Sequence, residues 1–226
     1  MGVVTGLDAI RNKIESRPQA GGERVDDREL TRNLKPGKDR TIRFVQELDE
    51  DSPHYNEELG LALVVSEHVH PDIWWLRLVD TFDEEGASLG SDKGWDSKLN
   101  LYINVVDVDS GEVFYLGRSV LGGLGQQIVE NGQDRGSLTD SVWKIKKKGE
   151  GMNTRYNLSL INITDEPVEV DPEDLVDFRK SVLNEVPYEQ QEAFVKQIEE
   201  RVRKKSQESA NDTSGDDDDD GDDDVW

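Results

Sequence analysis

The sequence predicts a mainly β protein with α-helical appendages, in which the strands form a small antiparallel barrel. Six or seven short segments alternate polar and apolar residues, as half-buried strands do, and most of them follow one another as hairpins. A single helical pattern, at residues 118–131, is inserted late among them, which argues against a βαβ sheet. After Asp165 the spacing of apolar residues becomes helical, so the helices are expected as an appendage.

The first strand is predicted over residues 40–45, with Arg40 and Arg43 expected on the face opposite Ile42 and Phe44. Further strands are predicted at residues 61–65, 74–78, 99–106, 112–116, 142–148 and 155–161. The turn sequence Asp109-Ser110-Gly111 joins two of these strands as a hairpin.

Both ends of the chain carry segments of different character. Residues 7–16 have the spacing of a short amphipathic helix, and a polar linker is expected to follow it. One C-terminal helix is predicted to open at Pro172, with Leu175, Phe178 and Val182 on one stripe, and a second at Pro187. The chain thus divides into an arm and linker (1–34), a barrel core (35–165), C-terminal helices (166–205) and an acidic tail (206–226).

The charge is unevenly distributed. The chain has 27 Lys and Arg against 50 Asp and Glu, a formal charge of −23, which at first argues against binding a phosphate polymer. Residues 206–226 hold ten of the acids and no base, so the tail is expected to be disordered and the rest of the chain carries −13. Such a tail can serve solubility alone, but its aromatic ending favours a docking peptide, comprising Asp222, Asp223, Asp224, Val225 and Trp226.

Several classes of protein are not supported by the sequence. The absence of cysteine excludes disulfides, thiolate metal sites and thiol nucleophiles. No apolar run long enough to span a membrane, no signal pattern and no phosphate-binding glycine loop is found, and Gly6 breaks a myristoylation motif. His68 and His70 lack a third metal ligand at a recognisable spacing. We therefore expect an intracellular protein without enzymatic activity, cofactor or metal.

Three segments reverse the sign of the charge, at residues 28–43, 144–155 and 201–205. The third is expected at the end of the last helix, where the helix dipole favours cations. In the second, alternation puts Lys144, Lys146 and Lys148 on one face of a strand. Mutual repulsion makes such a face costly unless an anion lies over it, although lysines also protect edge strands against aggregation.

Aromatic residues lie on or beside the same predicted strands as these cations. Cations that track phosphates and rings that stack on bases are the combination that binds single-stranded nucleic acid. The candidate DNA-binding residues are Lys35, Lys38, Arg40, Arg43, Trp74, Trp75, Arg77, Trp95, Lys98, Tyr102, Arg118, Trp143, Lys144, Lys146, Lys147, Lys148, Arg155 and Tyr156. Any single ring in this set can instead belong to the core.

In their order along the chain, these elements resemble the single-stranded DNA-binding proteins of tailed bacteriophages, nearest to those of the T-even phages. The matching parts are the N-terminal arm, the TIRFV strand at residues 41–45, the hairpin at 99–116 with the helix after it, and WKIKKKGEGMNTRY at 143–156. The helices and acidic tail complete the match. The zinc subdomain of the T-even protein is not carried over, because the chain has no cysteine.

The resemblance implies an OB-fold core that holds single-stranded DNA in a basic aromatic cleft. It also implies self-association through the arm, and a tail that contacts polymerase, helicase, primase or recombinase during phage replication, recombination and repair in the bacterial cytoplasm. Two other functions remain open: an acidic protein chaperone or DNA mimic, and a mediator of strand annealing or recombination.

Overall fold

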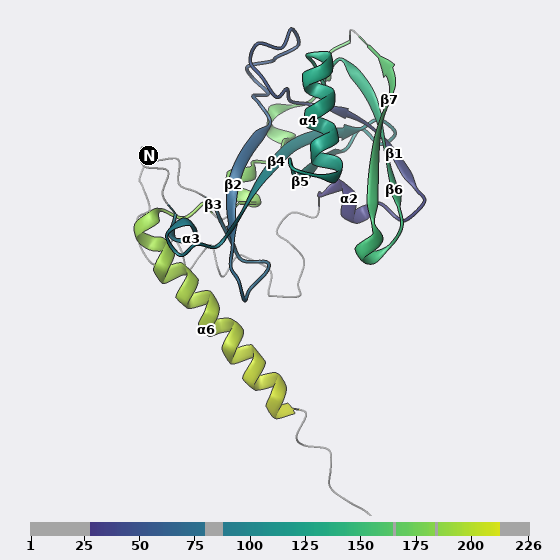
Figure 1. Ribbon diagram of the computed structural model, residues 1–226. Helices are drawn as coiled ribbons and strands as arrows, with labels where there is room; N and C mark the ends of the chain where they lie inside the picture. Colours follow the sequence, from purple (N-terminus) through teal and green to yellow (C-terminus); the bar gives the residue numbers. More distant parts are fainter. Residues whose placement is uncertain (1–27, 80–87, 165, 184, 213–226) are drawn as a thin grey trace, which may run out of the picture.

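The computed structural model describes residues 28–79, 88–164, 166–183 and 185–212 of the protein (Figure 1). The strands are β1 (Asp39–Phe44), β2 (Leu63–Val69), β3 (Arg77–Val79), β4 (Asp96–Asp107), β5 (Val113–Ser119), β6 (Ser141–Lys148) and β7 (Arg155–Ile163). The α-helices are α2 (Leu30–Asn33), α3 (Leu89–Asp92), α4 (Gly123–Arg135), α5 (Phe178–Ser181) and α6 (Tyr188–Asp212), with single 3₁₀ turns at Gly151–Asn153 and Pro172–Asp174. The predicted arm helix at 7–16 lies outside the described residues.

The strands form one antiparallel sheet of seven, in the order β3-β2-β4-β1-β6-β7, with β5 paired to β4. Strand β4 is long enough, at 12 residues, to pair with β2 through its first half and with β1 at its end. The mainly antiparallel β architecture with helices is therefore confirmed.

The sheet does not close, so the predicted barrel is wrong in this respect. No pairing joins β5 to β7 within the described residues. Helix α4 packs against both strands instead, and the side chain of Gln127 accepts from Leu158 N and donates to Tyr156 O. A side chain thus satisfies the edge of β7 where a further strand would pair, and the open side of the sheet is filled by a helix.

The main core lies between the sheet and α4. Its largest fully buried side chains include Trp143, Phe44 and Ile42. Leu30 and Leu34 are also in this core, so the end of the predicted linker is a docked helical turn instead of a free connection. No helix of the described residues is both long and apolar enough to cross a membrane.

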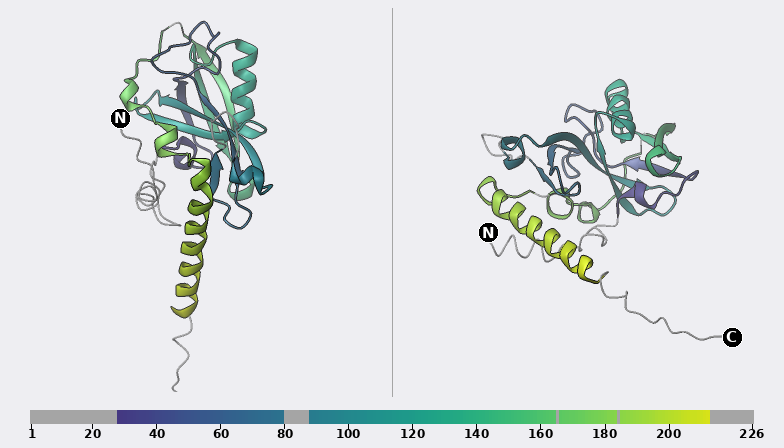
Figure 2. Two further views of the ribbon diagram at one scale, coloured as in Figure 1. Left: turned by 90° about the vertical axis from the view of Figure 1, so that its left-hand side faces the viewer. Right: turned by 60° about the horizontal axis from the view of Figure 1, so that its bottom comes forward.

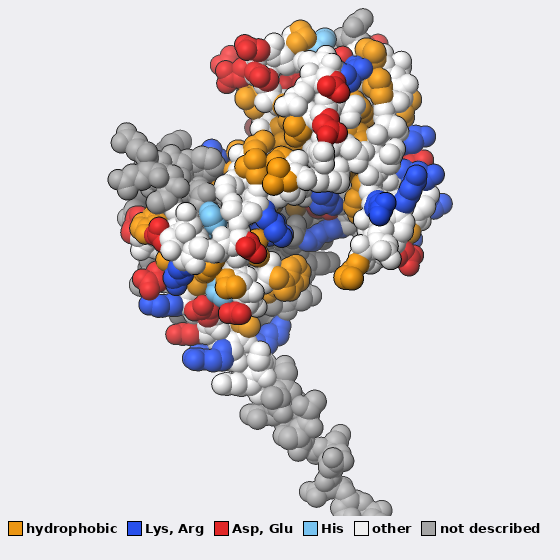
Figure 3. All heavy atoms as spheres, viewed as in Figure 1, with side chains coloured by type: hydrophobic (Ala, Val, Ile, Leu, Met, Phe, Trp, Pro, Cys, Tyr) orange, Lys and Arg blue, Asp and Glu red, His pale blue; other side chains and the backbone are white. Residues whose placement is uncertain are grey.

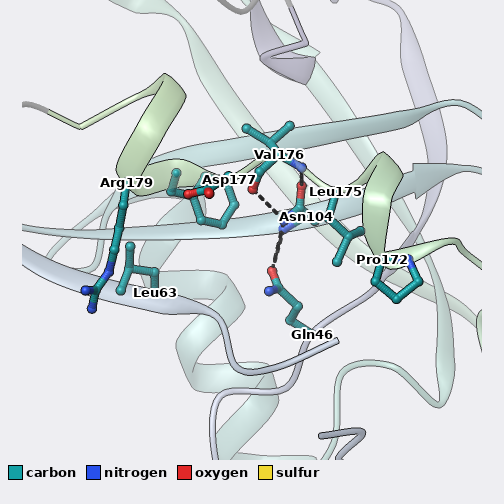
Figure 4. Close-up of a pocket in the computed structure, with 9 residues that line it drawn as sticks. Gln46, Leu63, Asn104, Pro172, Leu175, Val176, Asp177 and Arg179 are labelled. Atoms are coloured by element: carbon teal, nitrogen blue, oxygen red, sulfur yellow. Dashed lines mark hydrogen bonds between the residues drawn. The ribbon is translucent and has the colours of Figure 1, made fainter. Parts of the chain in front are cut away.

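A segment after β7 crosses the opposite face of the sheet, over β4 and β5. Val176, Phe178 and Leu183 pack there against Tyr102 and Tyr115. The predicted helix that opens at Pro172 is in fact a 3₁₀ turn and the short helix α5. Figure 4 shows the reason: Asn104 accepts from Val176 N and donates to Val176 O, as a neighbouring strand would, which keeps residues 175–177 extended between the two helical pieces.

The C-terminal boundary also differs from the prediction. Helix α6 continues to Asp212, so residues 206–212 are helical where a disordered tail was expected. Residues 213–226 lie outside the described part of the chain. Figures 1 and 2 show α6 extending well beyond the rest of the protein.

Candidate nucleic-acid interface

The hairpin of β6 and β7 is set by alternation on both strands and by the glycines of its turn. Gly149 has a φ of +72°, and a Cβ there would come within 2.4 Å of the Asn153 carbonyl oxygen, so only glycine fits. The turn brings Lys148 directly opposite Arg155.

The outer face of this hairpin is basic. Lys144, Lys146 and Lys148 lie on it, while Trp143 and Ile145 point into the core, as the alternation predicted. Because directly paired residues share a face, Arg155 joins the three lysines. We refer to Lys144, Lys146, Lys148 and Arg155 as the basic face; Figure 3 shows Lys and Arg side chains gathered over this hairpin.

The basic face is not explained as protection of a sheet edge. Strand β6 lies between β1 and β7, with hydrogen-bonded neighbours on both sides. Lysines that guard against aggregation are needed on edge strands, which β6 is not. The alternative interpretation of these lysines therefore loses its structural basis.

Among the described residues, little neutralises the basic face. Lys144 Nζ lies 3.7 Å from an Asp39 carboxylate oxygen, and the other two lysines and Arg155 are exposed. Lys148 and Arg155 form a directly opposed pair of like charges, which destabilises a sheet unless a counter-charge is bound. The basic face also has three polar cross-strand neighbours, which strand pairing puts on the same side of the sheet: Thr41, Asn157 and Ser159. They were not among the residues predicted from the sequence.

The two arginines of β1 are used by the fold itself. Arg40 shares a face with Ile42 and Phe44, contrary to prediction, and pairs with the fully buried Asp107. Burial raises the pKa of Asp107, but the hydrogen bond from Arg40 and two backbone amides outweigh it, and the net pKa is lowered. Arg43 donates to the carbonyl oxygens of Thr139, Glu166 and Pro167, and burial lowers its pKa.

Two candidate rings are wrong as stacking platforms because they are buried. Trp143 has no exposed surface and donates from Nε1 to Leu138 O at 3.0 Å. Tyr102 is 6% exposed and donates to the buried carboxylate of Glu67 at 2.8 Å. A base cannot reach either ring without unfolding the core.

Arg118, Lys147 and Tyr156 lie on the inner side of the sheet. The Arg118 guanidinium lies 5.5 Å from the centre of the Tyr156 ring and 3.0 Å from Glu29. Lys147 is paired with Tyr156 and half-buried. Arg118 and Tyr156 thus help to bridge β5 and β7, and they are not part of the basic face.

The remaining candidates fall into two places. Lys35 and Lys38 are exposed in the turn before β1, beside the end of β6, where Lys147 N donates to Lys38 O. The tryptophan group is at the other end of the sheet order, around β2 and β3. Its members are Trp74, which is 75% exposed, Trp75, which is 38% exposed, the half-buried Trp95, the exposed Lys98, and Arg77, whose partner is Glu67.

The two histidines His68 and His70 are not part of a metal-binding cluster in the described part of the chain. No group of three potential metal-ligating side chains is found among the described residues. Nδ1 of His70 accepts from two backbone amides, those of Asp72 and Ile73, and the Nε2 of His70 faces Glu199. His70 is therefore used in positioning a loop.

Comparison of the chain with family models, curated protein sequences and solved structures gave no match. The geometry of the basic face is therefore the basis for a functional proposal.

Proposed function

We propose that the protein binds single-stranded DNA without sequence specificity and without catalysis, through the basic face of the β6–β7 hairpin. One observation carries the proposal: an internal strand presents lysines at alternate positions to solvent, opposite a further arginine, in a chain whose net charge is −23. Retaining such a cluster on an acidic protein is favourable when a polyanion binds it.

The architecture supports the same proposal. The open, strongly paired sheet with a helix between β5 and β7 is consistent with an OB-fold-like core, which in its usual form is a partly open barrel that binds oligonucleotides. The phage proteins that the sequence resembles act in replication, recombination and repair, and we extend that role to this chain as part of the proposal.

The acidic tail supplies a means of regulation in this proposal. Residues 213–226 contain eight aspartates and end in Val225 and Trp226. A tail of this charge competes with DNA for the basic face, and DNA binding then frees the aromatic end to recruit replication or recombination enzymes. Deleting residues 213–226 should raise the affinity for DNA, most strongly at low salt, where screening is weakest. Unchanged or weaker binding would contradict this regulatory step.

The test of the binding face is a titration of labelled oligo(dT) with K146Q/K148Q and with a matched variant, K180Q/K196Q. Both variants lose two positive charges, and Lys180 and Lys196 are exposed lysines away from the basic face. Two lost phosphate contacts should reduce the slope of log K against log salt by about 1.4. The matched variant should keep the wild-type slope.

Equal losses in the two variants would show that only net charge matters and would refute the proposed face. If neither the wild type nor the tail-deleted protein binds oligo(dT), the proposal fails and an acidic chaperone or DNA mimic becomes the better interpretation.

A further inference from the structure

The basic segment at residues 201–205 does not lie at the end of its helix, so the helix dipole does not explain it. Helix α6 continues to Asp212, and its last turn contains no basic residue. Arg201, Arg203, Lys204 and Lys205 therefore lie more than one turn before the C-terminus of the helix, where the helix dipole contributes little. The dipole explanation predicted from the sequence is wrong.

The same helix leaves the body of the protein just before these residues. Phe194, Val195 and Ile198 are buried against Ile73 and Leu76, which flank the two exposed tryptophans. Val202 is half-buried, and the side chains of residues 203–207 are exposed. The projecting part of α6 in Figures 1 and 2 thus begins at the basic segment.

A hydrogen bond connects this helix to residues 70–76, which we refer to as the tryptophan loop. His70 Nε2 lies 3.1 Å from a carboxylate oxygen of Glu199, while its Nδ1 holds the amides of Asp72 and Ile73 at 3.2 Å. Loop and helix are therefore one packed unit. This fixed loop leaves Trp74 75% exposed, more than any other tryptophan in the described part of the chain.

Helix geometry places one cation of the basic segment on the side of this loop. Arg203 follows Glu199 by four residues, so it lies one turn farther along the same face of α6. An exposed indole and an exposed guanidinium are thus carried by two elements that are packed together. Stacking on rings and attraction of phosphates by cations are the two contributions that bind single strands without regard to sequence.

We propose that the tryptophan loop and the basic segment of α6 form a second contact surface for the single-stranded DNA bound at the basic face. This inference rests on the proposed function and adds a site to it. The ligand is the phosphate backbone together with unstacked bases, because an acidic peptide would use the cations and leave the exposed Trp74 without a role. A strand long enough to leave the basic face reaches this surface, whereas a short one does not.

The test compares R203Q/K204Q in the full chain with R179Q/K180Q, which removes an exposed arginine and an exposed lysine from α5, using two lengths of oligo(dT). A short probe of roughly 6 nucleotides lies near the lower end of the site sizes of single-strand binders, about 4–16 nucleotides, and a long one of roughly 30 exceeds them. R203Q/K204Q should bind the short probe as the wild type does and the long probe about 10-fold more weakly, with a salt slope lower by about 1.4. W74A should also weaken only the long probe, by about 5-fold or more.

Far-UV circular dichroism checks that α6 is retained, and R203K/K204R should restore long-probe binding because it keeps both charges. If R203Q/K204Q matches R179Q/K180Q while K146Q/K148Q is impaired on both probes, the second surface is refuted and the proposed function stands. If R203Q/K204Q binds DNA more tightly in the full chain and normally after deletion of residues 213–226, the segment holds the tail instead and the inference is wrong. A wild type that binds neither probe overturns both proposals.

Discussion

Replacing Trp143 by phenylalanine distinguishes a core role from a DNA-stacking role for this ring. Trp143 is fully buried, and its Nε1 donates to the Leu138 carbonyl oxygen at 3.0 Å. Phenylalanine has no donor, so it leaves that buried carbonyl unpaired, at about 1–3 kcal/mol. The smaller ring also leaves a void beside Phe44 and beneath Arg135, which adds about 1 kcal/mol. We expect W143F to lower the free energy of unfolding by about 2–4 kcal/mol.

The assay is urea unfolding followed by far-UV circular dichroism, because fluorescence changes when a tryptophan is removed. Affinity for oligo(dT) is measured on the same samples at a temperature where both proteins are folded. W74A is the matched control for the stability measurement alone, since Trp74 is 75% exposed and its loss should change the free energy of unfolding by less than about 0.5 kcal/mol. Weakened binding by W143F with unchanged stability would refute the burial argument and return Trp143 to the DNA interface.

Three other changes test the framework that positions the interface. E47A should lower the free energy of unfolding by about 3–5 kcal/mol, because the buried carboxylate accepts from four donors of the loop before β6. Urea unfolding measures this loss, and a value below about 1 kcal/mol would contradict the argument. N104A should lower the free energy of unfolding by about 2 kcal/mol and make the segment around Val176 cleavable in limited proteolysis. Equal cleavage of the wild type would show that the hydrogen bonds of Asn104 do not hold this segment on the sheet. The pKa of Asp107 is lowered below its ordinary value of 3.8 by Arg40, so the stabilisation that it provides is complete above that pH and is lost as the pH falls through the lowered pKa. The stability difference between wild type and D107N should therefore shrink below about pH 3.8, and a difference that grows on acidification would show that the sign is wrong.

Strand β6 shows which part of the interface is readable from sequence. Alternation along Trp143, Lys144, Ile145 and Lys146 predicted which side chains are buried and which are exposed, and the structure confirms both sets. Side-chain direction in a strand is a local property with a period of two residues, so no knowledge of the partner strands is needed. The same reasoning was misapplied at Arg40, which by its spacing belongs with Ile42 and pairs with Asp107 from β4.

The segment around Val176 shows where local pattern fails. Leu175, Phe178 and Val182 have helical spacing, yet no single helix contains them, because residues 175–177 are extended between a 3₁₀ turn and α5. Asn104 supplies hydrogen bonds that imitate a neighbouring strand, and the buried Tyr102 and Tyr115 accept the apolar side chains. Asn104 lies 72 residues before Val176, and the two tyrosines also come from the distant strands β4 and β5, so no local window contains these partners.

Sequence alone is sufficient for the antiparallel class, for six of the seven strands, and for a lysine-bearing hairpin in an acidic chain, because these depend on side-chain periodicity and composition. The strand predicted at residues 74–78 is wrong at Trp74 and Trp75, which lie in a turn before β3. Sequence is not sufficient for deciding which cations and rings are available to a ligand. That depends on strand order, because β6 is an internal strand and its lysines are therefore not needed to protect a sheet edge. It depends also on packing, which buries Trp143 and Tyr102 and leaves Trp74 exposed. It depends also on where α6 ends, since a helix that continues to Asp212 removes the dipole explanation for its basic segment. Partners distant in the chain decide each of these features, and only the folded arrangement brings those partners together.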